Sequence, residues 1–159
     1  MRKTLNRITN TKGIIGLLLI LSLGLVFQCK DGLNEDQLTE DLYQNSLTIA
    51  QESNRKLLIV FGADWCPDCQ SLKDRFFNNP EIAGILHEKY LTIHVDVGRF
   101  DKNLLFSEQF DSPQKKGIPA LVILDPNEPK KILATTKGGE FSSARTMSDE
   151  AIAKFLSEY

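Results

Sequence analysis

Residues 57–69 of this 159-residue chain, LLIVFGADWCPDC, hold the pattern that decides its expected fold. Leu57 to Phe61 is a run of apolar residues, which is typical of a short strand buried on both faces. Cys66 and Cys69 follow, and residues 70–77 are compatible with a helix. A strand-to-helix junction aims Cys66 at the positive end of the helix and brings the two sulfurs within bonding distance. The stretch therefore predicts a redox site.

The first 28 residues are expected to be an export signal that is separate from the folded domain. Residues 13–27 carry no charge; this run is short for a bilayer-spanning helix, which needs about 20 residues, and suits the apolar part of a secretory signal. The segment ends at Gln28-Cys29, which resembles a bacterial lipoprotein processing site. Basic residues without any acid precede the apolar part: Arg2, Lys3, Arg7 and Lys12.

Two interpretations of this segment stay open. The resemblance implies that the chain is cut before Cys29, that Cys29 is lipidated, and that residues 29–35 tether a domain of residues 36–159 to a membrane. The alternative is an uncleaved signal anchor. Both place the domain at a membrane, facing the periplasm or the cell exterior. From residue 29 onward, 21 acidic residues stand against 15 basic ones, a formal charge of −6, which disfavours nucleic acid as a partner.

The cysteine count favours chemistry at Cys66 and Cys69. With Cys29 lipidated they are the only thiols, in a compartment where disulfides persist. Two cysteines this close in sequence form too small a loop to stabilise a fold. A zinc site is the competing interpretation, but zinc needs four ligands, and the spacing of His87 and His94 does not fit the usual pattern. We therefore expect neither a metal nor a bound cofactor.

The remaining pattern predicts an α/β sandwich built from a helix, a β-α-β unit, a β-hairpin and a last helix. The first helix is expected to present Leu38, Leu42, Ile49 and Ala50 on its inward face. Ser148 is expected to cap the last helix. The expected helices are residues 36–55, 66–77, 81–90 and a segment after 148; the expected strands are residues 57–61, 91–97, 120–124 and 131–136.

The chemistry of the cysteine pair depends on which sulfur ionises, because only a thiolate attacks a disulfide. A helix N-terminus favours the thiolate of Cys66, and Pro67 suits the first helical position because its missing N–H would have no partner there. We expect Cys66 to be the exposed nucleophile and Cys69, one turn into the helix, to be the shielded resolving residue. The Asp68 carboxylate disfavours a nearby thiolate, so we expect a milder depression of the Cys66 pKa.

Trp-Cys-x-x-Cys after an apolar strand, with Gly117-Ile118-Pro119 directly before another strand, resembles the thioredoxin superfamily. The resemblance covers residues 57–159, and residues 61–66 and 79–82 are similar to the C-terminal periplasmic domain of the bacterial transmembrane disulfide reductase. It implies a thioredoxin-like three-layer sandwich, with a central mixed sheet flanked by helices. It also implies that Pro119 is a cis-proline facing the cysteines, and that the backbone at Ile118 pairs with a bound substrate chain.

One departure from the family concerns the proton of the second cysteine. Thioredoxins carry a buried acid six residues before the first cysteine, where this chain has Val60. Asp64 and Asp96 are the candidates to replace it, with water as the alternative. Trp65, beside the nucleophile, is expected to be half-exposed, where it shields the sulfur and contacts the substrate.

The sequence therefore predicts a membrane-tethered thiol–disulfide oxidoreductase that acts by dithiol exchange. Its expected partners are proteins that contain a disulfide and a dithiol protein that donates electrons. Reduction is the expected direction, because of Asp68 and the likeness to the reductase domain; disulfide oxidation or isomerisation is the alternative. An alternative from another class is a redox-inactive lipoprotein that keeps the fold as a binding module.

Overall fold

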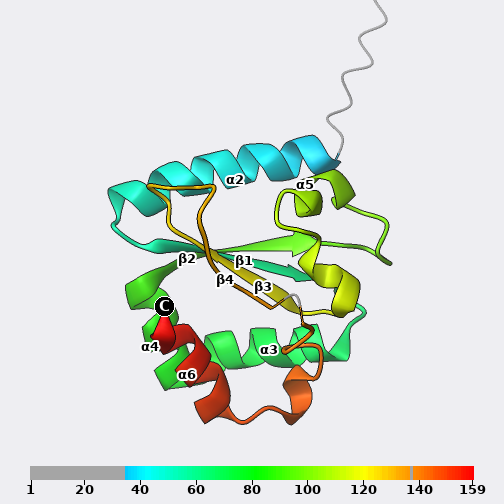
Figure 1. Cartoon of the computed structure of the whole chain (residues 1–159). Helices are drawn as coiled ribbons and strands as arrows, with labels where there is room; N and C mark the ends of the chain where they lie inside the picture. Colours follow the sequence, from blue (N-terminus) through cyan, green and yellow to red (C-terminus); the bar gives the residue numbers. More distant parts are fainter. Residues whose placement is uncertain (1–34, 137) are drawn as a thin grey trace, which may run out of the picture. The chain divides into compact units, whose positions relative to one another are not determined.

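The computed structural model describes residues 35–136 and 138–159. They form a four-stranded sheet with helices on both faces (Figure 1). The expected three-layer α/β sandwich with a central mixed sheet is therefore confirmed. Within the described residues, none of the helices has the length and apolar character that a membrane span requires. The expected signal, residues 1–28, and the expected lipidation site, Cys29, lie outside the described part of the chain.

The strands lie in the order β2-β1-β3-β4. β1 (Lys56–Gly62) is parallel to β2 (Tyr90–Asp96) and antiparallel to β3 (Ala120–Leu124). β3 and β4 (Ile132–Thr135) form the expected antiparallel hairpin. Because β1 has a neighbour on either side and helices over both faces, every residue from 57 to 61 is buried, as the continuous apolar run predicts.

Helices cover the two faces of the sheet unequally. α2 and α5 lie over one face, and α3, α4 and α6 lie over the other (Figure 1). Side chains alternate along β1. Leu57, Ile59 and Phe61 belong to the core on the face covered by α2 and α5, and Leu58 and Val60 belong to the core on the face covered by α3, α4 and α6. The helices are α2 (Glu35–Glu52), α3 (Pro67–Asn78), α4 (Pro80–Lys89), α5 (Leu104–Glu108) and α6 (Asp149–Glu158), with the short 3-10 helices η1 (Pro113–Lys116) and η2 (Ala144–Thr146).

The inward face of α2 differs from the expected one. Of the four residues expected to face inward, only Ala50 is buried, and Leu38, Leu42 and Ile49 are exposed. The Tyr43 ring instead packs edge-on against the rings of Phe106 and Phe110, with centroid distances of 5.5 and 5.7 Å. These contacts select the face because the sequence of α2 offers two apolar stripes. The buried residues are Tyr43, Ser46, Leu47 and Ala50.

Asn79 joins three helices at their ends. It ends α3 and begins α4, where its side-chain oxygen accepts the N–H groups of Glu81 and Ile82 at 3.0 and 3.1 Å. Pro80 follows at the start of α4, a position that needs no N–H partner. The Asn79 amide also donates to the Asp149 carboxylate at the start of α6, at 2.9 Å. The break between the second and third expected helices is thus held by the side-chain hydrogen bonds of Asn79.

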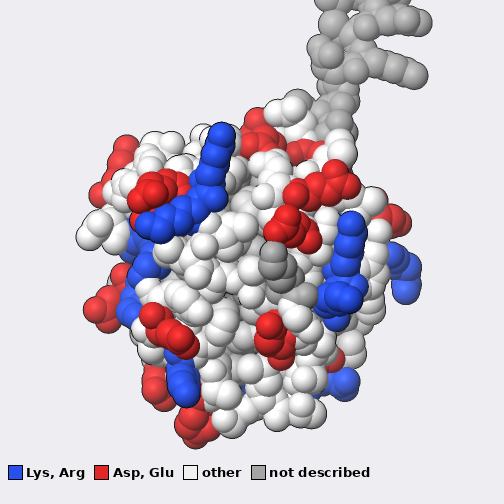
Figure 2. Space-filling view, in the orientation of Figure 1, with Lys and Arg blue, Asp and Glu red and all other residues white. Residues whose placement is uncertain are grey.

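Charged side chains of both signs are interspersed over the face of the molecule shown in Figure 2. Binding to a nucleic-acid backbone requires a stripe or patch of basic residues. The described residues on this face present no such patch, and acidic groups separate the basic ones.

We predict that Asn79→Ala lowers the free energy of unfolding by about 1–2 kcal/mol, because the first N–H groups of α4 lose their side-chain acceptor. Urea denaturation followed by circular dichroism measures the change. Ser148→Ala is the matched control: its hydroxyl caps α6 by accepting a single N–H at 3.2 Å, and its loss should cost about 1 kcal/mol or less. A smaller loss for Asn79→Ala than for Ser148→Ala would contradict the role of Asn79 as a three-helix junction.

Candidate active site

The cysteine pair lies where β1 ends and α3 begins. Cys66 is the N-cap residue of α3, with an extended backbone (φ −84°, ψ 115°), and Pro67 follows in the first turn. The Cys69 N–H donates to the Cys66 sulfur at 3.3 Å. A sulfur therefore takes the place of the oxygen that usually caps a helix. Cys66 thus lies at the helix N-terminus, the position expected from the sequence, and its effect on the Cys66 thiol stays a prediction.

The expectation that Cys66 is exposed is wrong. Only 4% of its surface is accessible, because the buried Ile118-Pro119 segment lies against it. The Cys66 thiol donates to the Ile118 carbonyl at 3.5 Å. The Ile118-Pro119 peptide bond is cis, as the family resemblance implies, and Gly117 before it has φ 128°, a conformation that favours glycine. The segment that we expect to contact substrate therefore covers the sulfur.

Cys69 lies one turn into α3, against the end of β1. A Cβ atom at Gly62 would lie 3.2 Å from the Cys69 sulfur, so the glycine leaves the space that the sulfur occupies. Cys69 is more accessible than Cys66, so the expectation that Cys69 is the more shielded of the two is wrong. Burial of the thiol, followed by its hydrogen bond with Cys66, nevertheless raises the pKa of Cys69 to about 12. Both residues are free thiols. At neutral pH Cys69 therefore keeps its proton.

Asp68 is not an isolated negative charge beside Cys66. Its carboxylate accepts the backbone N–H of Arg145 at 3.0 Å and forms an ion pair with the Arg145 guanidinium at 3.3 Å. The backbone hydrogen bond lowers the pKa of Asp68, so the carboxylate is ionised and partnered. Arg75 of α3 donates to the Ala144 carbonyl at 2.7 Å and holds η2 against the helix. The expected milder depression of the Cys66 pKa takes account of the Asp68 charge but not of the Arg145 charge beside it.

Trp65 is half-exposed, as expected, with 44% of its surface accessible. Its indole N–H donates to the Gly98 carbonyl at 2.7 Å. Phe100 packs edge-on against the ring at a centroid distance of 6.1 Å, and the Arg99 guanidinium lies 5.5 Å from the ring centroid. No sequence motif predicts a role for these three loop residues, although Gly98, with φ 56°, lies in a tight turn. The loop fixes the tryptophan beside the cysteines.

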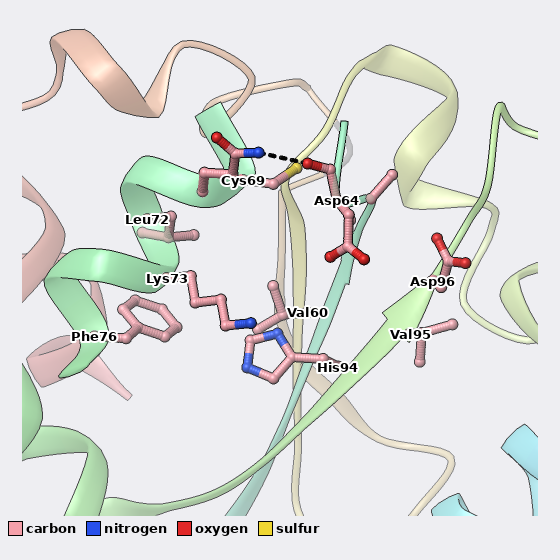
Figure 3. Close-up of a pocket in the computed structure, with 12 residues that line it drawn as sticks. Val60, Asp64, Cys69, Leu72, Lys73, Phe76, His94, Val95 and Asp96 are labelled. Atoms are coloured by element: carbon pink, nitrogen blue, oxygen red, sulfur yellow. Dashed lines mark hydrogen bonds between the residues drawn. The ribbon is translucent and has the colours of Figure 1, made fainter. Parts of the chain in front are cut away.

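A cavity of about 390 Å³ lies behind Cys69, between α3 and the strands β1 and β2 (Figure 3). Val60 forms part of its wall, at the position where the family carries a buried acid. Within residues 35–136 and 138–159, no group of three or more His, Cys, Asp or Glu side chains is arranged to hold a metal ion. The polar and ionisable residues that line the cavity are Asp64, Cys69, Gln70, Lys73, His94 and Asp96.

Comparisons with known proteins agree with this geometry. Residues 39–126, which include Cys66, Cys69 and Pro119, match a family model described as thioredoxin-like. The crystal structure of a disulphide isomerase from Xylella fastidiosa Temecula1 is similar at a TM-score of 0.70 and 31% identity, covering 86% of this chain and 97% of that one. The solution structure of a thioredoxin from Thermus thermophilus, with a TM-score of 0.56 and 20% identity, covers 73% and 82% of the two chains and shares the fold.

Curated relatives match over a shorter segment. Anterior gradient protein 3 of Mus musculus is 27% identical over 96 residues, which is 60% of this chain and 54% of that protein. Anterior gradient protein 2 homolog of Homo sapiens is 28% identical over 96 residues, which is 60% of this chain and 50% of that protein. The chain thus spans about half the length of the curated relatives it matches.

We predict that alkylation of Cys69 in a Cys66→Ala variant still accelerates with pH near about pH 10, above the ordinary thiol pKa of about 8.5. The reason is that burial raises the Cys69 pKa, so its thiolate fraction grows only at high pH. Iodoacetamide labelling followed by intact mass spectrometry measures the rate. The Cys69→Ala variant, with Cys66 at the helix N-terminus, is the control and should reach its plateau at a lower pH. A plateau for Cys69 near neutral pH would contradict the assignment.

We predict that Arg145→Ala slows alkylation of Cys66 at pH 7 by about two- to fivefold, the size expected for a partly exposed ion pair. Without the guanidinium, the Asp68 carboxylate acts uncompensated on the Cys66 thiolate. The rate is best measured in a Cys69→Ala background, so that one thiol reacts. Adding Asp68→Asn to Arg145→Ala should restore the rate, and equal rates with and without Arg145 would refute the compensation.

Proposed function

The chain belongs to the thioredoxin-like family, and on that premise we propose that it is a membrane-tethered thiol–disulfide oxidoreductase that reduces disulfides in other proteins. The hydrogen bond from the Cys69 N–H to the Cys66 sulfur carries this proposal, because it stabilises the thiolate that attacks a disulfide. The cis-proline segment beside the same sulfur supports an extended protein chain as the substrate.

The reaction follows from the unequal environments of the two sulfurs. The Cys66 thiolate attacks one sulfur of the substrate disulfide, forms a mixed disulfide and releases the other substrate sulfur as a thiolate. Cys69 then loses its proton and attacks the Cys66 sulfur, which releases the second substrate sulfur. The substrate gains two electrons and the Cys66–Cys69 pair becomes a disulfide. A dithiol protein must supply two electrons to return the pair to the thiol state.

Three residues form the proposed substrate contacts. Trp65 offers an exposed aromatic surface next to the nucleophile, held by its hydrogen bond to the Gly98 carbonyl. Ile118 contacts the Cys66 sulfur through its carbonyl, and Pro119 follows it in the chain. Because Cys66 is covered in the free protein, substrate must displace the contact between its thiol and the Ile118 carbonyl. The substrate backbone would then take over that carbonyl as a hydrogen-bond acceptor.

Export and tethering are proposed from the sequence of residues 1–35. The apolar run up to residue 27 and the Gln28-Cys29 boundary support lipoprotein processing. α2 begins at Glu35, so a chain of six residues, at most about 20 Å when extended, would separate the folded domain from a lipid on Cys29. Mass spectrometry of the mature N-terminus tests this: lipidated Cys29 is expected, and an intact leader with unmodified Cys29 would favour the signal anchor.

Isomerisation of protein disulfides is the second candidate function. The similar structure from Xylella fastidiosa Temecula1, at 31% identity, is titled a disulphide isomerase, which favours this reaction for the present chain. Reduction and isomerisation use the same attack by Cys66 and differ in whether Cys69 resolves the mixed disulfide or the substrate rearranges. The balance between them depends on the reduction potential of the pair.

We predict a reduction potential near about −270 mV, as in thioredoxins, because the proposed direction is reduction of the substrate. Equilibration with mixtures of reduced and oxidised glutathione or dithiothreitol, followed by mass spectrometry, measures it. A value near about −180 mV would favour the isomerase, and one near about −120 mV an oxidase.

Trapping provides the matched test of the substrate class. Cys69→Ala should hold substrate proteins as mixed disulfides on Cys66, whereas Cys66→Ala should hold none. A Cys66→Ser variant that kept the full cellular activity would contradict redox function and support the binding-module alternative.

A further inference from the structure

The strand register places a histidine on the sheet face behind Cys69. Val60 and Gly62 of β1 pair with His94 and Asp96 of the parallel strand β2, so these four residues lie on one face of the sheet. That face is covered by α3, the helix that carries Cys69. The Cys69 sulfur lies over Gly62. His94 lies diagonally across from Gly62 on the neighbouring strand, and the strand spacing and rise give a distance of about 8 Å between the Cα atoms of Gly62 and His94.

The space between the sulfur and this histidine is a cavity and not packed core. Cys69 and His94 both line the cavity of about 390 Å³, which is room for several water molecules at about 30 Å³ each. Figure 3 shows the imidazole next to Val60, the residue that stands where the family carries its buried acid. Val60 has no proton to exchange, so another group must accept the Cys69 proton.

We propose that His94 accepts the proton of the Cys69 thiol, through water in this cavity, during the resolving step. The inference rests on the proposed function. In that step the Cys69 S–H bond breaks and the proton passes through water to the imidazole. The Cys69 thiolate attacks the Cys66 sulfur of the mixed disulfide, the new S–S bond forms, and the substrate sulfur leaves with the electron pair of the broken bond. The imidazolium then releases the proton to water. The step needs no further oxidant or reductant.

The groups around His94 favour a neutral imidazole that is ready to accept a proton. Surrounding protein, followed by the positive charge of Lys73 on α3, lowers the pKa of His94, although the residue is exposed at the surface. Two carboxylates, Asp64 after β1 and Asp96 on β2, line the same cavity. His94 also lines a second pocket, together with the basic residues Arg55 and His87.

Of the two carboxylates, Asp96 is less suited to this role than the histidine, whereas Asp64 is exposed as His94 is. Asp96 accepts the Gly98 N–H at 2.9 Å and pairs with Lys102 at 3.3 Å, which commits it to the loop beside Trp65. Asp64 follows β1 and is exposed. It is the remaining competitor for the proton, and the experiment must separate it from His94.

The test measures the two steps separately by mass spectrometry. The reduced full-length chain is mixed with oxidised glutathione and quenched with acid at set times. The adduct of one glutathione on Cys66 reports the first attack, and its conversion to the Cys66–Cys69 disulfide reports the resolving step. The variants are His94→Gln, Asp64→Asn and, as the matched control, His87→Gln, which changes the other histidine of the chain. Thermal unfolding confirms that each variant is folded.

We expect His94→Gln to slow the resolving step at least about a hundredfold at pH 7, the lower end for loss of an acid–base group, while adduct formation changes less than about twofold. The defect should shrink as the pH rises, because hydroxide then removes the proton. His87→Gln and Asp64→Asn should behave like the unmodified chain.

Three results would overturn the inference. One is an unchanged resolving step in His94→Gln. Another is a defect of that step in Asp64→Asn alone, which would assign the proton to the carboxylate. The third is an equal slowing of both steps with the same pH dependence as the unmodified chain, which would indicate general distortion. If neither the glutathione adduct nor the Cys66–Cys69 disulfide forms on the unmodified chain, the proposed function itself is overturned, and the inference with it.

Discussion

The hydrogen bond from the Cys69 N–H to the Cys66 sulfur, at the start of α3, is the interaction on which the site depends. It caps the helix and it stabilises charge on the nucleophile, so folding and chemistry use the same contact. The cap is held in place by β1, which is buried on both faces and delivers the chain to the helix. Pro67 also favours the start of α3 at this position, because it has no N–H group that would need a partner there.

The two thiols are chemically alike and become different through their surroundings. Cys66 meets N–H donors and the positive end of a helix, whereas burial raises the pKa of Cys69. An attacking sulfur and a resolving sulfur need opposite properties at rest, and one helical turn provides both. The consequence is that Cys69 must be deprotonated during the reaction. The cavity behind it, open beside Val60, is where the structure offers a route for that proton.

Residues distant in sequence complete the site from two sides. Arg145, which lies in η2 near the last helix, pairs with Asp68 and opposes its charge. The loop after β2 holds Trp65 through the Gly98 carbonyl. The first contact fixes the first turn of α3, and the second fixes Trp65, which precedes the helix. The site is therefore rigid where the nucleophile is held, and it is covered where the substrate is proposed to enter, at Ile118.

The sequence by itself determined the strand-to-helix junction, the N-cap position of Cys66 and the hairpin, because each depends on local pattern. The cis-proline at Pro119 was implied by the resemblance to the thioredoxin superfamily. The sequence did not determine the burial of Cys66, the inward face of α2 or the partner of Asp68. Those depend on which segments meet across the sheet, and Arg145 lies 77 positions from Asp68 in the chain. The tertiary structure alone decided that the strand beside Val60 presents His94 to the cavity behind Cys69, because strand register, which no local pattern encodes, sets which side chains share a face.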